Sequence, residues 1–109
     1  MSDRVEMRDL SAEHFEPLVG EQFHLADRVL ELVEVERYPR ATLPRARRTN
    51  FSLLFRQAEG EPLMSGQYRV RHARIESADA LRIERIAPPA RFIEPAVYAD
   101  QPFYEIAFN

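Results

Sequence analysis

Residues 50–57 have the sequence NFSLLFRQ, in which Phe51, Leu53, Leu54 and Phe55 form a nearly continuous apolar run. Polar residues bound this run on both sides. An apolar run that is bounded by polar residues is typical of a β-strand buried on both of its faces. We therefore expect this strand to lie at the centre of the hydrophobic core.

Segments on both sides of this run alternate between apolar and polar residues, which indicates half-buried strands. In residues 103–109, for example, Tyr104, Ile106 and Phe108 share one face. In residues 29–38 the parity of the apolar positions changes near Leu32 and Val33, which predicts a β-bulge. The predicted strands comprise residues 21–26, 29–38, 50–57, 67–73, 81–86 and 103–109.

A short helix is expected before the first of these strands. Ser11 can cap its start, Phe15 and Leu18 lie at helical spacing, and Gly20 stands where a left-handed residue would end it. A helix of about two turns is not stable alone, so it has to pack on another element. We expect it to cover an end or a face of the sheet.

These elements predict a mostly β protein: a small antiparallel six-stranded barrel or sandwich with one short N-terminal helix. The alternation is the same in a barrel and in a sandwich, so both architectures remain open. A chain of 109 residues is too short for two cores. We expect a flexible N-terminus over residues 1–9 and a single β domain over residues 10–109.

Composition excludes several classes of function. The chain has no Cys, which removes disulfides, zinc–thiolate sites and cysteine nucleophiles, and we expect no cofactor. Its net charge of −3 argues against a nucleic-acid partner. All 15 residues counted as Lys or Arg are Arg. Neither a secretory signal nor an apolar run that could span a membrane is recognisable, so we expect a cytoplasmic protein with no membrane partner.

Four segments together resemble a known family. They are FEPLVGEQF from Phe15, FSLLFR from Phe51, SGQYRVRH from Ser65 and YEIAFN from Tyr104. The chain resembles a family of short bacterial proteins classed as a domain of unknown function, with the patterns FxPLxGxxF, FSLLFR, GxYxLxH and YEAxFN. Members of that family often neighbour proteins similar to phage tail-collar modules, and the resemblance thus implies an accessory or structural role. The chain departs from the family after Pro88, where members have a shorter, glycine-richer turn.

No recognisable arrangement of catalytic or metal-binding residues is present. His14, His24 and His72 lack the spacing of a metal site, and the acidic pairs are typical of solvated strand faces and turns. Glycine is too sparse for a phosphate-binding loop. We therefore expect neither a catalytic site nor a metal site, and we expect that the chain is not an enzyme.

Two segments are candidates for partner binding. Residues 38–49, the arginine loop, carry four arginines that could grip an acidic protein by bidentate hydrogen bonds, or that could simply be solvated. Residues 87–102, the aromatic loop, could expose an apolar patch to a partner or to a second copy, or could cover the core instead. The candidate partner-binding residues are Arg40, Arg45, Arg47, Arg48, Phe92, Ile93 and Tyr98.

The leading functional hypothesis is a non-enzymatic protein-binding or structural accessory domain, within a phage-tail-like or fibre-bearing assembly. A protein partner is expected, and self-association into a homo-oligomer is a second form of the same hypothesis. The alternative is a β-barrel carrier that holds a small apolar ligand. Large residues such as Phe51, Phe55 and Tyr104 are expected to fill the interior, which favours the first hypothesis.

Overall fold

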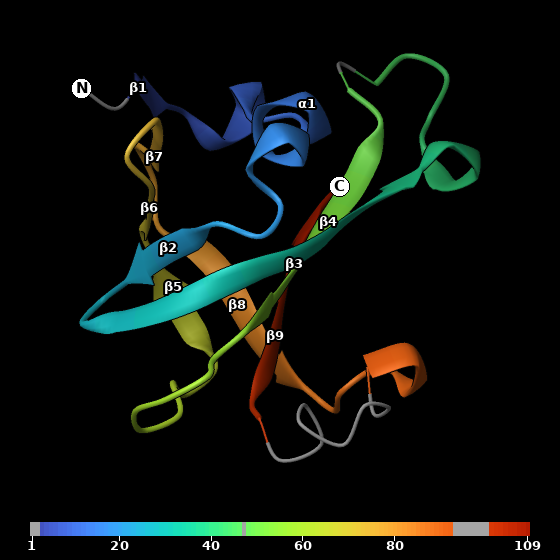
Figure 1. Ribbon diagram of the computed structural model, residues 1–109. Helices are drawn as coiled ribbons and strands as arrows, with labels where there is room; N and C mark the ends of the chain where they lie inside the picture. The colour runs from blue at the N-terminus through green and yellow to red at the C-terminus, as the bar shows by residue number, and fades with distance from the viewer. Residues whose placement is uncertain (1–2, 47, 93–100) are drawn as a thin grey trace.

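The computed structural model describes residues 3–46, 48–92 and 101–109, which form nine β-strands and a few short helical segments (Figure 1). The helical segments are η1 (Met7–Asp9), α1 (Ala12–Phe15), η2 (Glu16–Leu18), η3 (Pro39–Ala41) and η4 (Ala90–Phe92). The strands are β1 (Asp3–Val5), β2 (Gln22–Leu25), β3 (Arg28–Tyr38), β4 (Asn50–Arg56), β5 (Gly66–Tyr68), β6 (Val70–Arg71), β7 (Ile75–Ser77), β8 (Leu81–Ile86) and β9 (Phe103–Phe108).

The described strands form one mixed sheet in the order β1-β7-β6-β2-β3-β4-β9-β8-β5. All neighbours are antiparallel except β1 and β7, which are parallel. The protein is mostly β with a short helix, as the sequence predicts. The finer prediction of a small antiparallel six-stranded barrel or sandwich is wrong, because the described sheet has nine strands, includes one parallel pair and is not closed by hydrogen bonds.

The additional strands come from segments too short to show a period of two. The segment predicted as one strand over residues 67–73 is split at Arg69 into β5, which pairs with β8, and β6, which pairs with β2. The strand therefore changes partners within one residue. The sequence predicts a flexible terminus over residues 1–9, but β1 lies within these residues and pairs with β7. Next to this pairing, the Ala78 N–H donates to Val5 O at 2.8 Å.

β4 lies in the middle of the sheet, between β3 and β9, and all five residues from Phe51 to Phe55 are buried. The prediction of a strand buried on both faces is confirmed. Phe51, Leu53 and Phe55 point into the main core, whereas Leu54 is buried on the opposite face. A register shift between Leu32 and Glu34 confirms the predicted bulge in β3.

The helical segment covers one end of this core (Figure 1). The ring of Phe15 in α1 lies 6.3 Å from that of Phe23, 6.2 Å from that of Phe51 and 6.3 Å from that of Phe108. Gly20 ends the segment with φ of +91°, which confirms the predicted left-handed position. The strands alone would leave this end open, so α1 and η2 complete the core.

A buried polar network fastens the opposite end of the core to the turn after β4. The Tyr104 hydroxyl donates to Gln57 Oε1 at 2.9 Å and accepts from the Leu63 N–H at 2.7 Å. Gln57 Nε2 in turn donates to the carbonyl oxygens of Glu59 and Glu61. Burial raises the pKa of Tyr104, although the Leu63 N–H favours the phenolate. The network thus depends on a neutral phenol.

Because the folded state favours the neutral phenol, stability from Tyr104 is complete below the usual tyrosine pKa of about 10 and is lost at higher pH. The chain has neither Lys nor Cys, so few other side chains titrate in that range. We expect urea-unfolding curves to show a loss of stability above pH of about 10. Tyr104→Phe should be about 1–3 kcal/mol less stable at pH 7 and should lose less stability above that pH. An equal alkaline loss in both proteins would contradict the assignment.

Candidate functional site

The arginine loop is held at its base by hydrogen bonds. The Thr42 hydroxyl donates to Tyr38 O at 2.8 Å and accepts from the Asn50 N–H at 2.8 Å. Asn50 Nδ2 also donates to Ala41 O at 3.1 Å. These bonds join the two ends of the loop where it leaves β3 and enters β4, so the loop has a defined base although its sequence contains few core residues.

Arg48 binds the arginine loop to the N-terminal segment. Its Nη1 donates to Met7 O at 2.7 Å and to Leu10 O at 2.8 Å. The guanidinium also lies 5.7 Å from the ring centroid of Phe51 and 5.4 Å from that of Phe108, within the range of a cation–π contact. Of the arginines predicted to bind a partner, Arg48 thus has an internal structural role.

Arg40 and Arg45 are different, because both are exposed and neither has an ion pair with a described residue. Between them in the chain, Leu43 is 77% exposed. A hollow of about 480 Å³ beside them is lined by Ala41, Leu43, Ala46, Arg48, Asn50 and Asn109. The loop therefore exposes two arginines and a leucine, and the hydrogen bonds of Thr42 and Asn50 hold its base in place. Arg47 lies outside the described residues.

The described part of the aromatic loop packs against the sheet. The ring of Phe92 lies 5.7 Å from that of Phe103, and the Arg91 guanidinium lies 5.1 Å from the Phe92 ring. Arg91 also donates to both carboxylate oxygens of Glu34, at 3.0 and 2.8 Å. The sequence left open whether the aromatic loop exposes an apolar patch or covers the core. For Phe92 these contacts favour the second interpretation, in which its ring covers the core. Ile93 and Tyr98 lie outside the described residues.

An acidic surface that the sequence does not reveal lies on the outer side of the sheet. Glu34, Leu54, Glu105 and Glu84 stand in register across β3, β4, β9 and β8. Glu36 follows on the same side of β3. We call Glu34, Glu36, Glu84 and Glu105 the acidic face. Three of them, Glu34, Glu36 and Glu105, line a hollow of about 140 Å³ together with Ser52, Leu54, Ile86, Pro89 and Arg91.

Tyr38 stands between the arginine loop and the acidic face. Its hydroxyl lies 3.0 Å from Ser52 Oγ. This hydrogen bond favours the phenolate, but burial and the negative charges of Glu36 and Glu105 outweigh it and raise the pKa of Tyr38. The negative charge of the acidic face therefore extends to Tyr38, at the start of the arginine loop.

The three histidines stand on α1, on β2 and directly after β6. His72 is buried, with its ring 4.8 Å from that of Phe23; its Nδ1 accepts from the Arg74 N–H at 3.0 Å and its Nε2 lies 2.8 Å from Glu21 Oε1. Nδ1 of His14 accepts from the Ser11 N–H at the start of α1, at 2.9 Å. Within the described ranges, no group of three His, Asp or Glu side chains could hold a metal ion.

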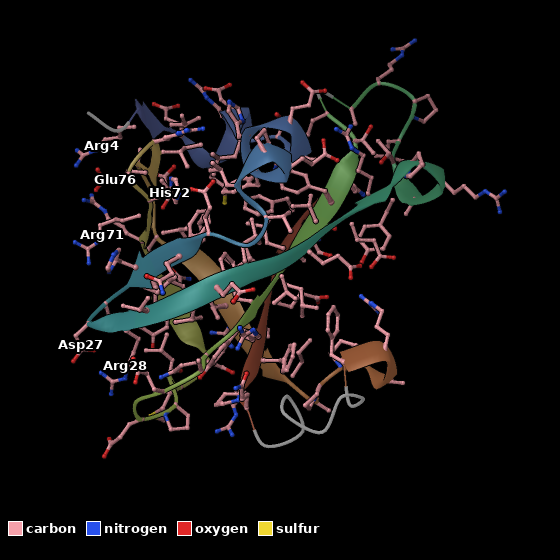
Figure 2. The ribbon with its side chains drawn as sticks, viewed as in Figure 1. Arg4, Asp27, Arg28, Arg71, His72 and Glu76 are labelled. Atoms are coloured by element: carbon pink, nitrogen blue, oxygen red, sulfur yellow. The ribbon has the colours of Figure 1, made fainter. Side chains whose placement is uncertain are left out.

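Arginines also gather near β6 and β7, at the edge labelled in Figure 2. Arg4 forms an ion pair with Glu76 at 3.6 Å, and Arg71 donates to Ala26 O at 3.0 Å. Arg69 and Arg74 are exposed and, like Arg40 and Arg45, have no ion pair with a described residue. Glu76 lies among them, and the described residues that line the hollow at this edge include no large exposed apolar residue such as Leu43, so this edge is a weaker candidate for protein binding.

Among the described residues no helix is long and apolar enough to cross a membrane. No curated protein and no solved structure matches the chain. One family model does match, and it extends over residues 10–108, which include every described strand except β1. The chain therefore belongs to the family described as a domain of unknown function, DUF6916.

Proposed function

We propose that this chain is a non-enzymatic protein-binding or structural accessory domain whose contact surface is the arginine loop. The proposal rests on one observation: Arg40, Leu43 and Arg45 are exposed on a braced loop, and the two arginines have no acidic partner among the described residues. Elsewhere in the described chain, most arginines pair with a carboxylate. Because the guanidinium of an arginine forms bidentate hydrogen bonds with a carboxylate, we propose an acidic protein surface as the partner.

The packing of the core supports a binding role over the alternative of a small-molecule carrier. The rings of Phe51 and Phe108 stack at 4.4 Å, and Phe23 meets Phe55 edge-on at 5.4 Å. These rings and Tyr104 occupy the space that a ligand would need.

We further propose an assembly of the phage-tail or fibre-bearing type as the setting of this contact. The support is the resemblance of the motifs from Phe15, Phe51, Ser65 and Tyr104 to the family described above. A small β domain with an arginine-rich loop suits an accessory subunit of such an assembly. Its partner there would present Asp and Glu side chains to Arg40 and Arg45.

The test compares capture of proteins from the native host by the immobilised wild-type chain, by Arg40→Ala/Arg45→Ala and by a matched control. The control is Arg69→Ala/Arg74→Ala, which removes the same charge from exposed arginines elsewhere on the surface. We expect the wild type and the control to retain an acidic protein that the first variant loses. Both variants should keep wild-type stability to within about 0.5 kcal/mol, because they change surface residues. Equal capture by all three proteins would contradict the proposal.

A further inference from the structure

We infer that the acidic face receives the arginine loop of a second copy of this chain. The inference rests on the proposed function of the arginine loop and adds a specific partner to it. It also gives a role to the acidic face, which the proposed function leaves unused.

The acidic face has more negative charge than its own neighbours neutralise. Glu34 is paired with Arg91, and Glu84 is paired with Arg82 at 2.7 Å. Glu36 and Glu105 have no ion pair with a described residue. Two carboxylates therefore remain for a cation from outside, just as two arginines remain on the arginine loop.

The sheet register places like charges opposite each other on this face. Glu84 in β8 and Glu105 in β9 are direct cross-strand partners. Like charges at directly opposed positions destabilise a sheet. The pair is balanced from one side by Arg82, which binds Glu84, and an arginine from a second copy would balance Glu105 in the same way.

The hollow between Glu36 and Glu105 suits the head group of one arginine. Its volume of about 140 Å³ is small, and the residues that line it include Ser52, Leu54 and three glutamates. A planar guanidinium can pack against the Leu54 side chain while it donates two parallel hydrogen bonds to a carboxylate. Tyr38 is partly exposed beside the hollow and can pack against the incoming side chain.

The arginine loop follows β3, the strand that carries Glu34 and Glu36 of the acidic face. In Figure 1 the loop after η3 and the η4 segment both lie at the right of the view, and the end of β3 that carries Glu36 leads directly into the loop. Adjacent patches of opposite charge can pair reciprocally across a two-fold axis. Each dimer would then contain two loop-to-face contacts, with Leu43 buried in each.

The experiment measures sedimentation of the full chain over a range of concentrations. The variants are Arg40→Glu/Arg45→Glu in the loop and Glu36→Arg/Glu105→Arg on the face. We expect the wild type to dimerise at low salt, and its dissociation constant to rise at least about tenfold at about 1 M salt, where the Debye length is about 3 Å. Each variant alone should sediment as a monomer, because like charges then meet in the contact. An equimolar mixture of the two should recover the dimer, since loop and face are again opposite in charge.

A second variant of the acidic face controls for the possibility that Glu36→Arg/Glu105→Arg does not fold. Glu36→Gln/Glu105→Gln keeps side-chain size and should weaken the wild-type dimer at least about tenfold, while Arg69→Glu/Arg74→Glu should leave it unchanged. A wild type that stays monomeric at low salt, or a mixture that fails to recover the dimer from two folded variants, would overturn the inference. If host-protein capture still required Arg40 and Arg45 in that case, the proposed function would stand without this partner.

Discussion

Replacing Phe15 with alanine is expected to destabilise the protein by about 3–5 kcal/mol, a large part of the total stability of a small domain. Phe15 is almost completely buried, and its ring contacts Phe23, Phe51 and Phe108 from three different strands. Because α1 is a single turn, the segment cannot close over the space that the ring leaves. Urea unfolding, followed by circular dichroism, measures the change.

The matched control is Val19→Ala, at the end of the same helical segment. Val19 is 45% exposed, so its truncation should cost less than about 1 kcal/mol. If the midpoints of the Phe15 and Val19 variants were equal, the helical segment would not complete the core. A cost near the upper end of the range would show that the strands do not relax to fill the space.

Replacing Arg48 with methionine is expected to cost about 2–4 kcal/mol, because two hydrogen bonds from a charged donor and two cation–π contacts are lost together. The carbonyl oxygens of Met7 and Leu10 would lose this donor, and the stacked rings of Phe51 and Phe108 would lose their cover. Chemical unfolding of the purified variant gives the cost.

Two further variants separate the charge of Arg48 from its shape. Arg48→Lys should recover only part of the stability, since an ammonium lacks the planar donor fork. Arg45→Met removes an exposed arginine from the same loop and should change stability by less than about 0.5 kcal/mol. Equal effects at both positions would mean that Arg48 is not the residue that binds the loop to the N-terminal segment.

Several features follow from local sequence because they depend on neighbours in the chain. The nearly continuous apolar run from Phe51 to Phe55 is sufficient to predict a strand that is buried on both faces. The change of parity at Val33 locates the bulge, and Gly20 marks the end of the helical segment. In each case the signal is a period or a glycine within a few residues, so no distant contact has to be known.

The choice of strand partners could not be read from such signals. The sequence predicts one strand over residues 67–73, yet Gly66–Tyr68 pairs with β8 and Val70–Arg71 pairs with β2. An alternation with a period of two shows which side chains share a face of the sheet. It does not show which strand pairs with which, or where a strand changes its pairing partner. The parallel pairing of β1 with β7 escapes the sequence for the same reason.

The candidate site shows the same division. The arginine loop and its exposed charges were predictable as a cluster, because the arginines lie within a few residues of one another. Arg48 donates to the carbonyl oxygens of Met7 and Leu10, which lie 41 and 38 positions earlier in the chain. Arg40 and Arg45 stay exposed, and only the tertiary structure shows this difference. The acidic face is assembled from β3, β8 and β9, so only the pairing of distant strands brings its carboxylates together. Periodicity thus determined the strands and the buried side of each, whereas long-range pairing decided which charges became neighbours.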